Sequence, residues 1–293
     1  MTIDRERSAE PVRVWRAGSR EIVLDHPIVM GILNVTPDSF NDGGNFFSVD
    51  AALDYAARMI EDDADIIDVG GESSRPGAES VSAAEEIQRV VPVVRTIRER
   101  WPSVAISIDT TKAGVARAAL DAGADIVNDV SAMRLDPEMA LMAGERGCGV
   151  ILIHSRGDVQ HMVTYDHAVY SDITSEVITE LSSQLLRADE AGVDRKSVVL
   201  DPGFGFSKRT EHSTRLLRDL REFDSLDVPI MVGVSRKRFV REASYSMAPG
   251  DADAATAAIN VVALERGAML FRVHNARMNR RALDAAWAVL SSS

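Results

Sequence analysis

The sequence has a single cysteine, Cys148, among its 293 residues, so a disulfide within the chain is excluded. It also lacks any apolar run that approaches the roughly 20 residues a membrane-spanning helix needs. The stretch from Met1 to Pro27 is charged and has none of the apolar centre of a secretory signal peptide. We therefore expect a cytoplasmic protein that is neither secreted nor embedded in a membrane.

Basic residues are in the minority, with 33 lysines and arginines against 45 aspartates and glutamates. The resulting formal net charge of −12 repels a polyphosphate backbone, which argues against nucleic acid as a partner. Hydrophobic residues make up 45% of the chain, enough for a large core. This composition is typical of an ordinary globular protein.

Short apolar runs recur along the chain, and several end in a polar residue followed by Gly, Ser or Thr. Each run is too short for an independent helix and has the continuous apolar character of a strand buried on both faces. Eight strands are predicted: Ile28–Asn34, Asp65–Gly70, Val104–Asp109, Asp125–Asp129, Gly149–His154, Ser197–Asp201, Pro229–Gly233 and Met269–His274. Between them lie predicted helices, which include 50–62, 83–100, 112–122, 171–191, 210–222 and 251–266.

The alternation of strands and helices predicts parallel βαβ units in an α/β fold. Eight strands favour a single (β/α)8 TIM-type barrel, because a doubly wound sheet more usually has five or six. The segments 12–15 and 21–24 predict an N-terminal β-hairpin that lies over one end of the barrel. No linker rich in Pro, Gly or Ser divides the chain, so we predict a tail and hairpin over residues 1–27 and the barrel over residues 28–293.

Polar side chains occur at nearly all the predicted C-terminal strand ends, where an α/β barrel carries its chemistry. A single Asp at such a place is usually a helix cap or turn residue, and a single His is usually structural. A nearly complete set is harder to explain in this way, because apolar residues would serve a purely structural barrel. The positions are Asn34, Asp68, Asp109, Asn128 with Asp129, His154, Asp201, Lys237, and Arg272 with His274.

These polar residues are of two chemical kinds. Asp109, Asn128 and Asp201 offer acceptors and amide groups suited to a flat heterocycle with N–H donors. A second group suits a compact anion such as phosphate or diphosphate, and consists of Arg272, His274, Asn34, Ser74 and Arg75. Mg²⁺ is compatible with this group, since Asn34 and phosphate oxygens suffice as ligands. The six histidines show no zinc-binding spacing.

Two Gly-containing loops, residues 34–44 and 70–77, follow the first two predicted strands. Their Pro, Asp, Ser and Gly residues are ordinary turn formers, so a purely structural interpretation is available. The functional interpretation is a pair of lids that exclude water and complete the site. Phe40 favours the lids, because an exposed phenylalanine in a loop is costly unless it packs on a ligand.

In this order, the motifs strongly resemble those of the dihydropteroate synthase family. The similar stretches are Met30–Phe40, Asp68–Ser73, Arg75–Gly77, Ser107–Thr110, Asn128–Asp129, Asp201–Phe206, Ser235–Lys237 and Arg272–His274. The resemblance runs from about Ile28 to the C-terminus and implies a pterin-binding catalytic (β/α)8 barrel. It implies a transferase of folate biosynthesis that joins 6-hydroxymethyl-7,8-dihydropterin diphosphate to 4-aminobenzoate and releases diphosphate, with Mg²⁺ present.

The resemblance also assigns site residues in this sequence. For the pterin ring it implies Asp109, Asn128, Asp201, Gly233 and Lys237, of which Asp109, Asp201 and Lys237 would be catalytic. For the diphosphate it implies Asn34, Ser74, Arg272 and His274, with Asn34 also the ligand of Mg²⁺. For 4-aminobenzoate it implies Phe40, Arg75, Pro76, Phe206 and Lys237. Sulfonamides are then expected to compete with 4-aminobenzoate, and the family suggests a homodimer.

The sequence departs from the commonest family pattern at several positions. Ser74 stands where Thr is usual, Ser155 where Met is usual, and Asn275 where Asp is usual. Arg238 follows Lys237 where some relatives carry Ser, and its guanidinium could attract the aminobenzoate carboxylate. None of these changes removes a residue assigned to the chemical step.

Two other functions compete with this interpretation. One is a pterin-binding barrel without condensation, such as the pterin-binding module of corrinoid-dependent methyltransferases. Such a module would not need Phe40, Arg75 with Pro76, or the Ser235–Lys237 motif, all of which are present. The other is a degenerate homologue that serves only as a partner of a true synthase. Intact charged groups at every strand end argue against it, because burying them without a ligand is costly.

Overall fold

The computed structural model describes residues 13–36, 49–72, 80–244 and 249–292. Its central sheet is parallel, with strand order β8-β7-β6-β5-β4-β3-β10-β9, and a parallel bridge between Leu200 and Ile230 joins the two edges into a barrel. The strands are β3 (Ile28–Asn34), β4 (Ile66–Gly70), β5 (Ala105–Asp109), β6 (Ile126–Asp129), β7 (Gly149–Ile153), β8 (Val198–Asp201), β9 (Met231–Val232) and β10 (Leu270–Val273). The predicted TIM-type barrel is confirmed.

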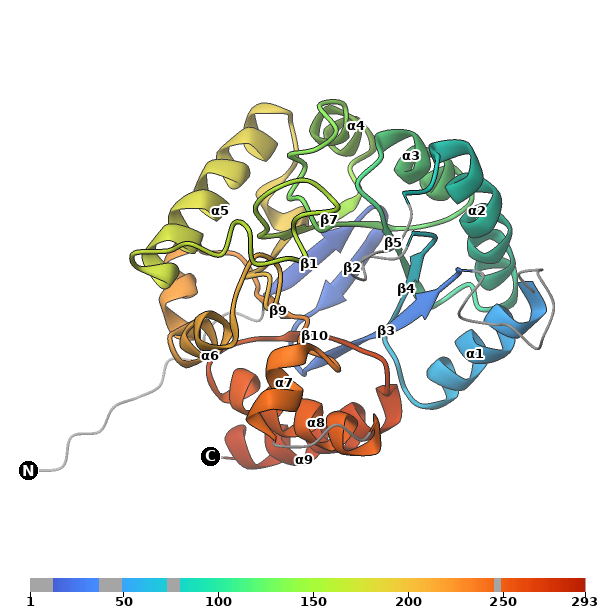
Figure 1. The fold of residues 1–293 in the computed structure, drawn as a ribbon. Helices are drawn as coiled ribbons and strands as arrows, with labels where there is room; N and C mark the ends of the chain where they lie inside the picture. The colour runs from blue at the N-terminus through green and yellow to red at the C-terminus, as the bar shows by residue number, and fades with distance from the viewer. Residues whose placement is uncertain (1–12, 37–48, 73–79, 245–248, 293) are drawn as a thin grey trace, which may run out of the picture.

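Helices surround the strands, as Figure 1 shows. They are α1 (Val49–Glu61), α2 (Ala83–Arg100), α3 (Ala113–Asp121), α4 (Met139–Arg146), α5 (Ile173–Glu190), α6 (Thr210–Arg218), α7 (Arg238–Ala243), α8 (Pro249–Glu265) and α9 (Ala276–Leu290). Short 3-10 helices at Arg195–Ser197 and Leu220–Leu226 precede β8 and β9. No helix in the described part of the chain is long and apolar enough to cross a membrane.

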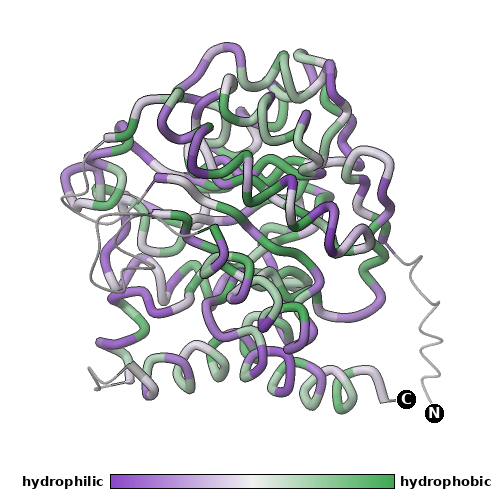
Figure 2. The backbone as a smooth tube through the Cα atoms, turned by 90° about the vertical axis from the view of Figure 1, so that its right-hand side faces the viewer, coloured by the Kyte–Doolittle hydropathy of each residue, from purple (hydrophilic) through white to green (hydrophobic). Residues whose placement is uncertain are grey.

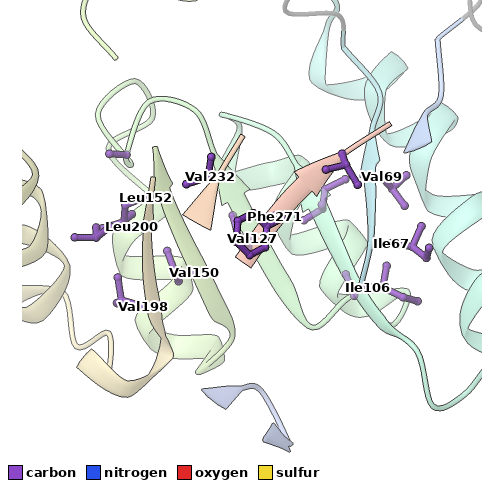
Figure 3. Close-up of a cluster of buried hydrophobic side chains, with 14 of the residues drawn as sticks. Ile67, Val69, Ile106, Val127, Val150, Leu152, Val198, Leu200, Val232 and Phe271 are labelled. Atoms are coloured by element: carbon purple, nitrogen blue, oxygen red, sulfur yellow. The ribbon is translucent and has the colours of Figure 1, made fainter. Parts of the chain in front are cut away.

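Alternating residues of the strands enter two different cores. One set faces the helices, and Figure 3 shows its members Ile67, Val69, Ile106, Val127, Val150, Leu152, Val198, Leu200, Val232 and Phe271. The other set faces the barrel interior and includes Ile28, Met30, Ile66, Ile126, Ile151, Val199, Met231 and Leu270. Figure 2 shows apolar segments concentrated inside the molecule and hydrophilic ones toward its outside. Strands with two buried faces explain why the sequence shows continuous apolar runs.

The N-terminal hairpin, β1 (Val14–Ala17) and β2 (Arg20–Val23), covers the end of the barrel where the strands begin. Trp15 is fully buried, and its Nε1 donates to Ser197 O, just before β8, at 2.8 Å. Arg20 donates to Asp125 Oδ1, just before β6, at 2.9 Å. The hairpin is therefore confirmed, and it leaves the C-terminal ends of the strands as the place for a site.

Candidate active site

An arginine held between two aspartates lies at the centre of the candidate site. Arg272, in β10, donates from Nε to Asp68 Oδ2 at 2.6 Å and from Nη2 to Asp109 Oδ2 at 2.6 Å. Asp68 lies in β4 and Asp109 ends β5, and neither strand neighbours β10 in the sheet. Although burial opposes it, the charge of the two aspartates raises the pKa of Arg272 above its usual value. The guanidinium therefore remains charged inside the barrel.

Asp109 titrates close to neutrality. Burial raises the pKa of its carboxyl to about 7, while Arg272 opposes this shift and Asp68 adds to it. Its side chain keeps 26% of its surface exposed, so a ligand can reach the carboxyl. Asp109 can consequently hold or release a proton near physiological pH.

Three buried acceptors near this arginine have no hydrogen-bond partner among the described residues: Asp68 Oδ1, Ser107 Oγ and Asn128 Oδ1. Asp68 and Ser107 occupy paired positions of β4 and β5, and Asn128 donates from Nδ2 to Asp68 Oδ2 at 3.1 Å. Leaving a buried polar atom unpaired costs about 1–3 kcal/mol. This layer of the barrel is therefore suited to a ligand or water with hydrogen-bond donors.

Asp201 ends β8 on the far side of the barrel from Asp68, with β7, β6 and β5 between their strands. Its Oδ1 accepts a hydrogen bond from Gly203 N at 2.7 Å. Burial raises the pKa of Asp201, and Lys237 opposes the shift. A Cβ on Gly233 would lie 3.0 Å from Asp201 Oδ2, so this glycine keeps the second carboxylate oxygen accessible.

Lys237, just before α7, interacts electrostatically with Asp201 and binds the loop after β8. Its ammonium donates to Phe204 O and lies 4.1 Å from the centre of the Phe206 ring. Burial lowers the pKa of Lys237 to about 8, although Asp201 favours the charged form. Lys237 is placed to serve two neighbouring parts of a site, one polar and one aromatic.

The predicted anion-binding residues in the described part of the chain border the same cluster. His274 follows β10, and its Nδ1 lies 2.9 Å from Ser235 Oγ, which also accepts a bond from His274 N at 3.1 Å. Asn34 ends β3 beside Gly70, where a Cβ would lie 3.8 Å from Asn34 Oδ1 and 3.6 Å from the Cβ of Asp109. Ser235 thus orients the imidazole, and Asn34 and Asp109 flank the same glycine.

Two departures from the family pattern have local structural reasons. Asn275 donates from Nδ2 to Asp253 Oδ2 at 3.1 Å, and Asp253 also pairs with Arg236. An aspartate at 275 would place a second carboxylate against Asp253, so the amide suits this position. Ser155 donates from Oγ to Val130 O at 2.7 Å, which directs its hydroxyl to the backbone.

The structure brings Asn34, Asp109, Asn128, Asp201, Phe206, Gly233, Lys237, Arg272 and His274 to the C-terminal end of the barrel. Phe40, Ser74, Arg75, Pro76 and most of the two predicted lids lie outside the described residues. Asp68 was predicted from the sequence to end a strand but had no assigned role, and the Ser107 hydroxyl was not predicted as part of the site. A signal existed for both, because each interrupts an otherwise apolar strand.

Comparison with known proteins identifies the family. The family model described as pterin binding enzyme matches residues 30–274. The dihydropteroate synthase of Streptococcus pyogenes serotype M18 is 44% identical over 262 residues, which cover 89% of this chain and 95% of that protein. The chain belongs to the dihydropteroate synthase family. It is therefore a transferase of folate biosynthesis.

Solved dihydropteroate synthases share the fold described above. The enzyme of Xanthomonas albilineans, solved with 4-aminobenzoic acid, has a TM-score of 0.89 and 38% identity, covering 96% of this chain and 100% of that one. The enzyme of Yersinia pestis, solved with a sulfonamide drug, has a TM-score of 0.88 and 37% identity, covering 95% and 100%. Dihydropteroate synthases are thus similar to this chain along most of its length.

Proposed function

We propose that the polar cluster at the strand ends is where this synthase binds its two substrates and joins them. The pterin ring lies between the Asp109–Asn128 side of the barrel and Asp201, with Lys237 at its edge. The observation that carries this assignment is the layer of unpaired buried acceptors beside Arg272. Those atoms require donors, and a pterin presents ring N–H and amino groups.

The diphosphate is assigned to Arg272, His274 and Asn34, together with Ser74. The two aspartates occupy Nε and Nη2 of Arg272, and no bond of Nη1 occurs among the described residues. A guanidinium held in this way offers its remaining donors to an anion without having to be oriented first.

Mg²⁺ fits this end of the barrel through Asn34. The described residues contain no group of three or more His, Cys, Asp or Glu arranged for a metal ion, so we propose no protein-built cage. An amide oxygen such as that of Asn34 is the type of ligand Mg²⁺ accepts, together with substrate phosphate oxygens and water. The bound ion would neutralise charge on the diphosphate.

In the proposed reaction, the bond between the pterin methylene carbon and a diphosphate oxygen breaks, and its electron pair leaves with the diphosphate. The amine nitrogen of 4-aminobenzoate forms the new C–N bond and loses one proton to water. Asp109 and Asp201 stabilise the positive charge that develops on the pterin, while Arg272 and His274 stabilise the departing anion. No side-chain nucleophile is needed.

The aminobenzoate ring is assigned to Phe206 and the stem of Lys237. Phe40, Arg75 and Pro76 complete this pocket in the proposal. A sulfonamide drug binds the related Yersinia pestis enzyme, so we propose that sulfonamides compete with 4-aminobenzoate here.

The test is turnover of both substrates by the variant Asp109→Asn, followed as diphosphate release and dihydropteroate formation. The amide keeps the shape of the side chain but loses its charge, so kcat should fall by about 10²–10³. Asp121→Asn is the control, because Asp121 is a 61% exposed carboxylate paired with Arg146 at the surface. Near-native turnover by folded Asp109→Asn protein contradicts the proposed site.

We also propose a homodimer that forms through α8. Ala254, Ala258 and Val262 are exposed at intervals of four residues and so form an apolar stripe on this helix. Solvent-facing helix surfaces are usually polar, and exposed apolar stripes mark contact surfaces. The family resemblance supports a second copy of this chain as the partner.

A further inference from the structure

Lys208 is a buried lysine that the proposed reaction does not use. It is only 2% exposed and follows residues 202–207, the loop that leads from β8 toward α6. Taking an ammonium group out of water costs several kcal/mol unless hydrogen bonds compensate. The contacts of Lys208 therefore indicate what the chain gains from it.

The Lys208 ammonium finds its acceptors on two segments that lie far apart in the sequence. Nζ lies 2.7 Å from His154 Nδ1 and donates to Phe206 O at 3.0 Å, with His154 O at 3.4 Å. Burial lowers the pKa of Lys208 well below its usual value, although Asp201 and Glu180 favour the charged form. The lysine joins the end of β7 to the backbone of the 202–207 loop.

His154 extends this connection to helix α5. Burial, together with the charge of Lys208, lowers the pKa of His154 to about 4, so the ring is neutral. A neutral ring can accept from Lys208 at Nδ1 and donate from Nε2 to Glu180 Oε2, which lies at 3.0 Å on α5. His154 thus acts as a rigid support, as expected of a lone histidine.

The loop that Lys208 holds has an unusual backbone. Gly203, Gly205 and Ser207 have φ values of +73°, +76° and +48°. A Cβ on Gly203 would lie 1.8 Å from His154 O, so the loop also packs directly against the end of β7. Left-handed conformations of this kind persist only where surrounding contacts enforce them.

Two lysines bind alternate carbonyls of this loop, Lys237 at Phe204 O and Lys208 at Phe206 O. The Lys237 ammonium also lies over the ring of Phe206. If the Phe206 carbonyl were released, this ring would have additional orientations available.

We propose that Lys208 is a positioning residue that fixes Phe206 as a preformed platform for the aminobenzoate ring. The inference rests on the proposed function, because it assumes that Phe206 lines that pocket. Lys208 touches neither substrate and acts through the backbone of its loop. Among the strand-end residues assigned to the pterin diphosphate, Asp201 feels the charge of Lys208 but makes no hydrogen bond to it in the described part of the chain, so we expect pterin binding to depend on Lys208 far less than aminobenzoate binding does.

The test is steady-state kinetics of Lys208→Met, which keeps the apolar stem and removes the ammonium. We expect the KM for 4-aminobenzoate to rise about ten-fold, the result if only about a tenth of the molecules hold Phe206 correctly. The KM for the pterin diphosphate should change less than two-fold. Arg280→Met is the control, since Arg280 is buried beside Asp65 at the other end of the barrel and should affect stability alone.

Phe206→Ala, alone and combined with Lys208→Met, separates the inference from its assumption. If Phe206→Ala alone leaves the KM for 4-aminobenzoate unchanged, the proposed pocket is wrong, whatever Lys208 does. If it raises that KM and Lys208→Met then adds nothing further, the two residues act as one unit. Additive effects, or equal changes in both KM values, overturn the inference.

His154→Leu provides a second route if Lys208→Met does not fold. It removes the nitrogen acceptor of Lys208 while the lysine remains. The same selective rise in the KM for 4-aminobenzoate supports the inference, and an unchanged KM in folded His154→Leu protein overturns it.

Discussion

The Asp109 carboxyl and the Lys237 ammonium both have pKa values moved toward neutrality by burial, to about 7 and about 8. In each case the pKa shift favours the uncharged form of the side chain, whereas the role that we assign to each residue requires its charged form. Asp109 must be ionised to stabilise a developing cation, and Lys237 must be protonated to donate at the pterin edge. The fully charged pair is therefore most populated in a narrow interval of pH.

A bell-shaped dependence of kcat/KM on pH follows. Activity should fall below about pH 7 as Asp109 takes up a proton, and above about pH 8 as Lys237 loses one. Asp109→Asn should remove the acid limb, and Lys237→Arg should move the alkaline limb upward because a guanidinium stays charged. Ionisation of the substrates affects the unmodified protein and both variants alike. If the acid and alkaline limbs of the pH profile persist unchanged in the variants, Asp109 and Lys237 are not their origin.

Among the secondary-structure elements, the hairpin β1–β2 has a purely structural role. Its indole reaches the barrel through one buried hydrogen bond, from Trp15 Nε1 to Ser197 O. The hydrogen bonds of Trp15 and Arg20 join the hairpin to Ser197 and Asp125, at the strand ends opposite to those that carry Asp109 and Arg272. Stability and activity should therefore separate when this contact is removed.

Trp15→Phe should lower the free energy of unfolding by about 1–2 kcal/mol, since a buried carbonyl loses its partner. Its kcat should stay within two-fold of the unmodified protein. Denaturant unfolding and turnover measure the two quantities. Trp287→Phe is the control, because the indole of Trp287 makes no hydrogen bond among the described residues; an equal loss of stability in both variants would count against the role of the Ser197 contact.

Strand elements were predictable from sequence because both faces of each strand are buried. The prediction for Ile28–Asn34 is exact, and most others differ by one residue at an end. Two elements differ more from their predicted bounds. Within the run Pro229–Gly233 the strand covers only Met231–Val232, with a bridge at Ile230 before it, and the helix predicted over 210–222 ends at Arg218. There a 3-10 helix takes over at Leu220, which helical periodicity alone does not reveal.

The placement of the candidate site residues together at the strand ends was equally predictable, because parallel strands bring their C-terminal ends together. Lys208 was not. A lysine after a loop rich in glycine is normally exposed, and its burial depends on a contact with His154, 54 positions earlier in the chain. Tertiary contacts of this kind leave no local pattern in the sequence.

At the scale of the whole molecule, the proposed α8 interface can be tested by charge. Ala258→Arg places a guanidinium in the centre of the exposed apolar stripe, so two copies would bring like charges together. We expect light scattering to show a dimer for the unmodified protein and a monomer for the variant. Leu186→Arg, at a 57% exposed leucine on α5, should remain dimeric. Dissociation by Leu186→Arg alone would place the interface elsewhere.

In the described part of the chain, Trp15 and its hairpin cover the N-terminal end of the barrel, so we expect both substrates to enter at the C-terminal strand ends. When two substrates enter at the same end of a barrel, the one that binds deeper must bind first and is released last. With the pterin among the strand ends and 4-aminobenzoate nearer the loops, excess 4-aminobenzoate should block the way in and slow turnover when pterin diphosphate is scarce. Initial rates at rising 4-aminobenzoate concentration measure this substrate inhibition. Rates that only saturate would show that the two substrates do not bind in a fixed order.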